Sequence, residues 1–291
     1  MKQAIQNALY NPVNESIPDV EPTCSTGDCI WPHFSSLAVC AQVANISNRL
    51  SSFHVSAAVR APIGYKVTLP NGAYLEAGQH VMNITTLPSI VGGWQRSQSN
   101  ATLAFFNESS ISDTAISNFF VIYRKTTNST TVDDFGAMEV LLHWCVNTYD
   151  TKVVAGDAVT SITSNVTRVV TNDGTILLSN NTTELKDTSD PSNYTETGSL
   201  VLRPMNGNVG NNFTVESKAK LALDMYLLSV FGGTYGKGFG RSYSSDAAMM
   251  ISSALFDQPS QAHATGQTAE DIRLHCMEIA AQNMATSMTN K

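Results

Sequence analysis

The sequence predicts an α+β fold, with an antiparallel β-rich central region, a helical C-terminal third and a short N-terminal helix. Two observations support this prediction. Between Phe53 and Val215, short β-prone runs alternate with polar turns, whereas after Val215 the apolar residues recur at helical spacing. The strands and helices are therefore grouped along the chain, which is typical of α+β proteins and not of parallel α/β sheets.

The N-terminal part is predicted to be a short helix followed by a Cys-containing segment. Met1 to Tyr10 places apolar side chains on one helical face, and Asn11-Pro12 ends the pattern. A stretch rich in Pro and Cys continues to about Cys40. We expect one domain over residues 1–291, with a Cys-containing segment at 1–52, a β-rich part at 53–215 and a helical part at 216–291.

The central part contains several runs with the composition and length of strands. Two of its turns have specific chemistry: Asn71-Gly72 suits a type I′ hairpin turn, and Asn172-Asp173-Gly174 tolerates positive φ between two strands. The polar stretch from Asn180 to Gly198 is expected to be an exposed loop. The predicted strands are Tyr65 to Leu69, Ala73 to Glu76, Ser117 to Arg124, Ala137 to Tyr149, Ala158 to Thr171, Thr175 to Ser179 and Ser199 to Arg203.

The C-terminal third contains three predicted helices, Lys218 to Phe231, Ser245 to Phe256 and Ala269 to Met288. The last begins with a recognisable start signal, because Thr268 is a good N-cap and acidic residues follow in the first turn. The apolar run within the first of these helices is too short to cross a bilayer. The N-terminal residues lack the apolar stretch of a signal peptide, so we expect any entry signal to lie upstream.

Charge and composition restrict the class of partner. The chain has 291 residues and a formal net charge of −7, and no Lys/Arg cluster exceeds two residues, so nucleic acid is not an expected partner. Only 14% of residues are charged, against about 25% in typical globular proteins, and Ser, Thr and Asn fill the gap.

These Asn residues often stand in the Asn-x-Ser/Thr acceptor pattern for N-glycosylation, which requires exposure in a secretory protein. Most of the sites fall in polar, turn-like stretches. We therefore expect a glycoprotein that works outside the cytosol. The acceptor sites are Asn14, Asn45, Asn83, Asn100, Asn107, Asn128, Asn165, Asn180, Asn181, Asn193 and Asn212.

Five cysteines predict two disulfides and one leftover thiol in an oxidising compartment. Cys24 to Cys29 is favoured because a Gly-containing turn separates the two residues, and Cys29 to Cys40 is the alternative. A long-range bond from Cys145 to Cys276 completes the expected set. Cys40 is then the unpaired cysteine. A zinc site built from these cysteines and the neighbouring histidines is disfavoured, since the ligand spacing is wrong, and no metal is expected.

The Gly-rich segment from Phe231 to Ser242 invites comparison with phosphate-binding loops. Its glycines fit neither the Walker pattern nor the dinucleotide pattern, so a flexible loop between helices is the preferred interpretation. Lys237 and Arg241 are retained as candidate contacts for an anionic ligand. We expect no cofactor.

The sequence predicts no catalytic residues. Motifs of serine hydrolases and metalloproteases are absent from it. A glycosidase needs two carboxylates that flank a sugar, and Asp133, Asp134 and Glu139 are the available candidates, although acidic residues in a turn are usually solvated. A secreted glycoside or peptide hydrolase of an unrecognised class is therefore kept as the alternative to a binding domain.

The segment CSTGDCIWPHFSSLAVCAQVANIS, from Cys24 to Ser47, resembles the signature of a large fungal family of membrane proteins that is known only as a domain of unknown function. Asp28 departs from the Asn usual there, and Val43 from a frequent second Cys. The resemblance implies membrane spans beyond both ends of this sequence, with the domain displayed outside the cell. It carries no established activity.

Together these observations predict a non-enzymatic, glycosylated ectodomain of a fungal membrane protein. The expected partner is an unknown extracellular ligand or a cell-wall component.

Overall fold

The computed structural model confirms the predicted α+β class, because antiparallel sheets pack against helices that lie mostly after them in sequence. The predicted N-terminal helix, Met1 to Tyr10, lies outside the residues that the structure describes. Those residues are 22–55, 64–76, 80–86, 102–105, 114–125, 131–172, 175–178, 194–197, 199–205, 212–237, 241–257 and 267–289.

The main sheet is organised around one strand of 20 residues, β8 (Phe135–Val154). Strand β2 pairs with it on one side, and β7 and β9 pair with successive parts of its other side. All of these pairings are antiparallel. The other strands of this sheet are β1 (Cys29–Ile30), β2 (Phe34–Asn45), β6 (Met82–Thr86), β7 (Ala115–Arg124), β9 (Asp157–Ser164), β15 (Gly233–Lys237) and β16 (Arg241–Tyr243).

Strand β8 buries apolar side chains on both of its faces. Met138, Val140 and Leu142 belong to the core beneath the helices, whereas Phe135 and Ala137 belong to a second cluster. The sequence of a strand that is buried on both faces is a nearly continuous apolar run. The predicted run from Ala137 to Tyr149 is therefore the middle of β8.

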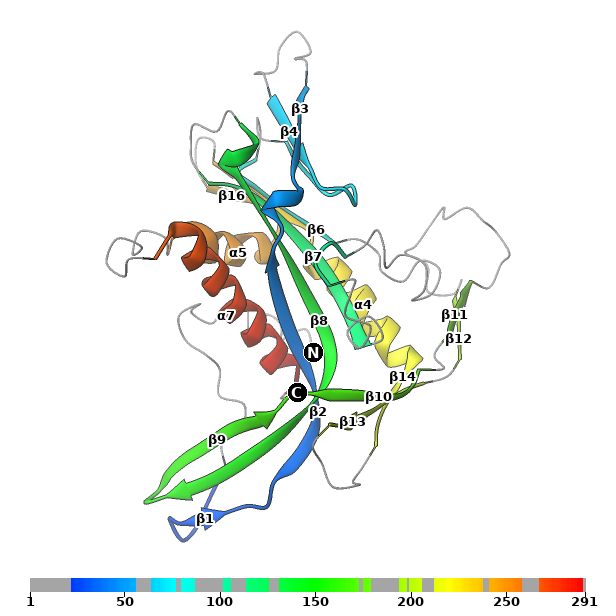
Figure 1. The fold of residues 1–291 in the computed structure, drawn as a ribbon, viewed down its shortest axis with the longest axis vertical. Helices are drawn as coiled ribbons and strands as arrows, with labels where there is room; N and C mark the ends of the chain where they lie inside the picture. The colour runs from blue at the N-terminus through cyan, green and yellow to red at the C-terminus, as the bar shows by residue number, and fades with distance from the viewer. Residues whose placement is uncertain are drawn as a thin grey trace.

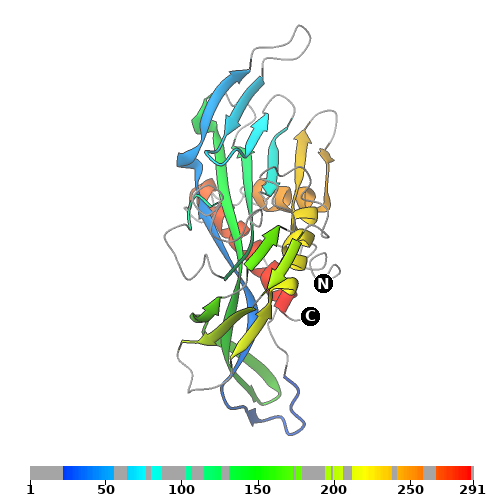
Figure 2. The same ribbon diagram turned by 90° about the vertical axis from the view of Figure 1, so that its right-hand side faces the viewer.

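Three helices, α4 (Ser217–Val230), α5 (Asp246–Phe256) and α7 (Ala269–Thr289), cover one face of the main sheet (Figures 1 and 2). Their predicted positions agree to within one residue at each end. The predicted cap of α7 is confirmed, since Thr268 Oγ1 accepts the Asp271 N–H at 3.1 Å. Thr268 also donates to the carboxylate of Asp271, and these hydrogen bonds lower the pKa of that group.

A small sheet packs on the opposite face of the main sheet. Its Val67 and Leu75 contact a cluster that includes Phe120 and Phe135. The predicted hairpin at Asn71-Gly72 is present, but only Gly72 has a positive φ, +92°, so the turn is not type I′, which needs two such residues. The strands are β3 (Ser51–Val55), β4 (Gly64–Thr68) and β5 (Tyr74–Glu76), and short 3₁₀ turns lie at Ser47–Arg49 and Val132–Asp134.

A third sheet, formed by β10 (Thr167–Asn172), β13 (Ser199–Pro204) and β14 (Phe213–Glu216), packs on β8 where Val146 meets Leu200 and Leu202. The predicted run from Ala158 to Thr171 is divided between β9 and β10 at Asn165-Val166. The predicted loop from Asn180 to Gly198 is wrong in its last part, because β12 pairs with β11 there. Strands β11 (Thr175–Leu178) and β12 (Tyr194–Thr197) form a separate two-stranded sheet.

In the Gly-rich segment after α4, residues 233–237 and 241–243 form the two strands of a β-hairpin, β15 and β16, so the predicted flexible loop is wrong for these residues; residues 238–240 lie outside the described part of the chain. Tyr235 and Tyr243 stack across this hairpin with ring centroids 4.9 Å apart. Gly233 is required where the hairpin meets α5, because a Cβ there would lie 2.2 Å from Oγ of Ser245. Gly233 therefore permits close packing of the hairpin against α5.

The distal halves of β8 and β9 form an arm that projects from the body of the molecule (Figure 1). Its tip is a two-residue turn in which Ala155 and Gly156 have φ values of +54° and +88°. Alanine is strained in this left-handed region. The loop closed by Cys24 and Cys29 supports the turn, since Asp28 Oδ1 accepts the Ala155 N–H at 2.8 Å.

The disulfides agree only in part with the sequence prediction. Cys24–Cys29 is confirmed, but the second bond joins Cys40 to Cys145, and Cys276 is the unpaired cysteine, buried in the core. The predicted Cys145 to Cys276 bond is therefore wrong. The reason is strand register: Cys40 of β2 lies opposite His143, so Cys145 is its diagonal neighbour, with the two Cα atoms 5.8 Å apart.

Candidate binding groove between strand β2 and helix α7

Strand β2 presents one edge of its backbone away from the sheet. Among the described residues, β8 is the only strand that pairs with it over these 12 residues. In an antiparallel pair the N–H and C=O groups of alternate residues point toward and away from the partner. Ile46, just after β2, donates its N–H to the carbonyl of Ala137 in β8 at 2.9 Å. The even-numbered residues of β2 therefore direct their backbone N–H and C=O groups toward β8.

The odd-numbered residues of β2 consequently direct their backbone groups outward. Val39 confirms this direction, because its N–H donates to Oγ1 of Thr289, at the end of α7, over 2.9 Å. That threonine also donates to the carbonyl of Ala285 at 3.0 Å. Helix α7 thus covers the outer edge of β2 at one point, as proteins commonly do with exposed strand edges.

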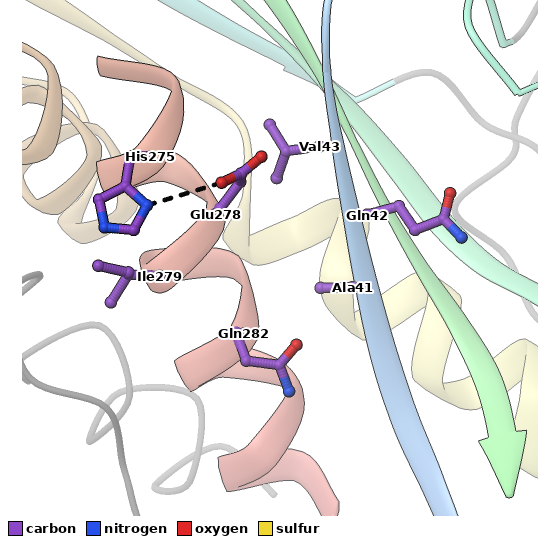
Figure 3. A pocket seen from close by; sticks show the side chains of 7 residues that line it. All are labelled: Ala41, Gln42, Val43, His275, Glu278, Ile279 and Gln282. Carbon is purple, nitrogen blue, oxygen red and sulfur yellow. Dashed lines mark ion pairs between the residues drawn. The ribbon is translucent and has the colours of Figure 1, made fainter. Parts of the chain in front are cut away.

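Helix and strand then diverge. In Figure 1, the C-terminal end of α7 meets β2 and its N-terminal end lies away from it. The wedge between them is an open groove of about 460 Å³. Figure 3 shows its lining, with α7 on one side and β2 on the other. The lining residues are Ala41, Gln42, Val43, His275, Glu278, Ile279 and Gln282.

The groove combines apolar walls with a few polar groups. The helix contributes residues spaced three and four apart, which lie on one helical face. His275 Nδ1 lies 3.7 Å from a Glu278 carboxylate oxygen, and these side chains are 68% and 51% exposed. Such a pair is screened by water, so Glu278 stays available to a ligand. Backbone donors, one carboxylate and two small apolar side chains suit binding of a polar, extended ligand.

No residue of this groove was among the sequence-predicted site residues. A signal does exist, because Leu37, Val39, Ala41 and Val43 alternate with other residues at the period of a strand. The Pro and Cys content of the segment obscured it. The position of α7 beside this strand depends on tertiary packing, which the sequence pattern does not give.

The Cys40–Cys145 disulfide lies close to the groove. Cys40 stands between Val39 and Ala41 in sequence, so the bond fixes the strand that forms one wall. Asn147 Oδ1 lies 3.7 Å from each sulfur. Neither sulfur carries a hydrogen in the disulfide, so these two approaches are packing contacts and not hydrogen bonds.

Lys237 and Arg241 are brought together by the β15–β16 hairpin. Their backbones lie opposite each other in its register, at the end next to residues 238–240. Their side chains lie outside the described part of the structure. Anion binding by this pair therefore stays a prediction.

Four acceptor asparagines fall within the described residues. Asn45, Asn165 and Asn212 are exposed. Asn83 is half-buried in β6, and its amide nitrogen donates to the Tyr74 carbonyl at 2.6 Å and to Thr85 Oγ1 at 3.2 Å. The sites at Asn14, Asn100, Asn107, Asn128, Asn180, Asn181 and Asn193 lie outside the described residues.

The candidate carboxylates of a hydrolase are not assembled as a pair. Glu139 is fully buried, and one of its oxygens accepts the N–H groups of Leu103 and Ala104 at 2.8 and 2.9 Å. Asp134 instead accepts from Thr131 in a capping box, and Asp133 is exposed. Each carboxylate therefore has a separate local environment.

The histidine and cysteine environments likewise differ from those of a metal site. Burial lowers the pKa of His143, and its hydrogen bond with the Trp144 carbonyl opposes that shift only in part. Cys145 is consumed by the disulfide, and burial raises the pKa of the Cys276 thiol. In the described part of the chain, no group of three or more such side chains is placed to hold a metal ion.

A second buried polar cluster joins α7 to the sheet and to α5. Arg273 donates to the carbonyls of Leu255 and Lys125 and to the carboxylate of Glu270. The hydroxyl of Tyr123 also donates to Glu270. Burial and this carboxylate together raise the pKa of Tyr123 well above its ordinary value. These four hydrogen bonds connect α7 to α5 and to the end of β7, which points to a structural role.

No protein-family model, curated protein or solved structure matches this chain. None of the helices within the described ranges has the length and hydropathy needed to span a bilayer.

Proposed function

We propose that this chain is the glycosylated ectodomain of a fungal membrane protein, and that it binds an extracellular ligand, partner or wall polymer without chemically altering it. The observation that carries this proposal is the Cys40–Cys145 disulfide beside the groove. Disulfides persist in oxidising compartments. Here one of them holds in place the strand that lines the groove.

Two further features support the proposal. Asn45, Asn165 and Asn212 are exposed, as an N-glycan requires. The groove presents backbone donors and acceptors, amides and a single described carboxylate, Glu278, which are groups suited to recognition. The net charge of −7 favours a neutral or basic partner over a nucleic acid.

The compartment is tested by the intact mass of the protein purified from the cells that make it, with and without a glycosidase and under reducing and non-reducing conditions. We expect glycans, two disulfides and one free thiol. A protein with no glycan and five free thiols would overturn the proposal.

Site mapping makes this test sharper. Peptide mass spectrometry should find glycans at Asn45, Asn165 and Asn212 and none at Asn83, because the amide nitrogen of Asn83 is already engaged. Asn45→Gln should remove one glycan, whereas the matched change Asn48→Gln, at a nearby exposed asparagine outside any acceptor pattern, should remove none.

The non-enzymatic part of the proposal needs a separate measurement. The purified domain should show no turnover on broad libraries of glycosides and peptides. Turnover that a single carboxylate substitution abolishes would establish the hydrolase alternative instead, and Glu278→Gln is the substitution to examine first because Glu278 lines the groove.

A further inference from the structure

The outer edge of β2 is an incomplete part of the main sheet. Ala41 and Val43, whose backbone groups point away from β8, lie on the groove wall. Helix α7 lies farther from the strand here than at Val39. Among the described residues, no group accepts their N–H or donates to their C=O. Within the described ranges, two backbone donors and two acceptors thus lie without a partner along this strand edge.

The ends of this free edge are well defined. On one side, Thr289 of α7 already occupies the N–H of Val39. On the other, Asn45 ends the strand, and its Oδ1 accepts the Ser47 N–H at 3.0 Å. The free length between them accommodates an added strand of about three to five residues.

We propose that the β2–α7 groove binds an extended peptide segment of a partner protein, which adds to β2 as a further antiparallel strand and carries a basic side chain opposite Val43. This inference rests on the proposed function and names the partner class for the same groove. Main-chain hydrogen bonds provide affinity in such complexes, and alternate side chains provide specificity.

The preference for a basic side chain follows from the lining. Residues directly opposite each other in an antiparallel pair direct their side chains to the same face. The side chain opposite Val43 therefore points to the α7 side, where Figure 3 shows Glu278 next to Val43 and Gln282 next to Ala41. A lysine or arginine there would face the carboxylate.

Charge also favours a foreign peptide over a second copy of this chain. Two copies that paired through their β2 edges would bring together two molecules of net charge −7. The two Glu278 side chains would lie at the same interface. Like charges across an interface disfavour association, whereas a basic segment is attracted.

The experiment uses the whole purified domain and a panel of blocked, fluorescent peptides of about five residues, which alternate valine and threonine and carry one lysine at each position in turn. Binding is measured by fluorescence polarisation. A matched panel replaces lysine by glutamate. A third panel methylates the backbone nitrogens of alternate residues, which removes the N–H groups of the added strand and leaves the protein unchanged.

Val43→Pro removes one outward N–H without breaking the ladder to β8, since that N–H points away from β8. Proline is tolerated at such edge positions. The control Val43→Thr keeps the N–H and the β-branched shape. We expect Val43→Pro and N-methylation each to weaken binding by about tenfold or more, the effect of losing one or two hydrogen bonds, and Val43→Thr to have little effect.

Glu278→Gln should abolish the preference for lysine over glutamate, whereas Asp157→Asn on the distant arm, which changes the net charge equally, should leave it intact.

The inference is overturned if no peptide binds, or if N-methylation and Val43→Pro leave peptide binding unchanged. It is also overturned if sedimentation shows a dimer that Val43→Pro dissociates, because a second copy is then the occupant. These results leave the glycan and thiol counts untouched, so failure of the inference is distinct from failure of the proposed function.

Discussion

Replacing both cysteines of the Cys40–Cys145 disulfide by alanine should lower the free energy of unfolding by roughly 5 to 6 kcal/mol. The two residues are 105 positions apart. A cross-link that closes a loop of about 100 residues removes about 4.7 kcal/mol of chain entropy from the unfolded state, expressed at room temperature. Cys145 is fully buried, so the lost sulfur adds a packing cost of about 1 kcal/mol.

The protein contains its own matched control. Cys24 and Cys29 are only five positions apart, and the same relation gives about 2 kcal/mol for a loop of that size. Cys24 and Cys29 are only half-buried, so alanine at these positions leaves no enclosed cavity. The double alanine variant of Cys40 and Cys145 should therefore lose about 3 to 4 kcal/mol more than the double alanine variant of Cys24 and Cys29.

Equilibrium urea unfolding of the three proteins, followed by tryptophan fluorescence, measures these differences. The dependence of the unfolding free energy on urea should also increase when the long bond is removed, because the unfolded chain then expands. Equal losses in the two variants, or a larger loss for the short loop, would refute the loop-entropy reasoning.

Three further predictions concern buried polar groups. Glu139→Ala should lower the free energy of unfolding by about 3 kcal/mol, because two backbone N–H groups and the Asn118 amide lose their acceptor; Glu139→Gln keeps one acceptor oxygen, and an equally large loss in that variant would contradict the account. The pKa of Tyr123 is raised from 10.0, so the contribution of its protonated hydroxyl to stability is present below about pH 10 and declines as the pH rises further. The urea midpoint of the native protein should therefore fall between about pH 9 and about pH 11, and Tyr123→Phe should lessen that fall. An unchanged fall in the variant would argue against a raised pKa for Tyr123. The Cys276 thiol is buried and should react with a thiol reagent only after unfolding, with Cys276→Ser as the blank; rapid labelling of the native protein would show that the thiol is accessible.

Elements with strong periodicity were predictable from the sequence. The three C-terminal helices agree with their predicted ranges because apolar residues recur at helical spacing, and the middle of β8 agrees because its sequence is a nearly continuous apolar run. Strand β2 was missed, although Leu37, Val39, Ala41 and Val43 alternate correctly. Small residues, cysteine and glutamine in this segment have little intrinsic preference for a strand, and pairing with β8 supplies what composition does not.

The candidate site was less predictable than the fold. Cysteine pairing depends on the register between β2 and β8, and no local pattern specifies that register. The groove depends on the angle at which α7 leaves the edge of β2, which is a property of packing. The Gly-rich hairpin was misjudged because Gly233 is selected by the proximity of Ser245, a contact between segments that sequence spacing does not reveal.

The position of the Cys40–Cys145 bond has a consequence for alignment errors during folding. A slip of β2 by one residue against β8 would turn Val39 and Ala41 away from the helices and expose them. A slip by two residues would keep each side chain on its face, so hydrophobic patterning alone would not reject it. The disulfide joins diagonal neighbours and is satisfied in one alignment only. The bond therefore selects the native register of the two strands over the two-residue slip, which burial of the side chains alone would tolerate.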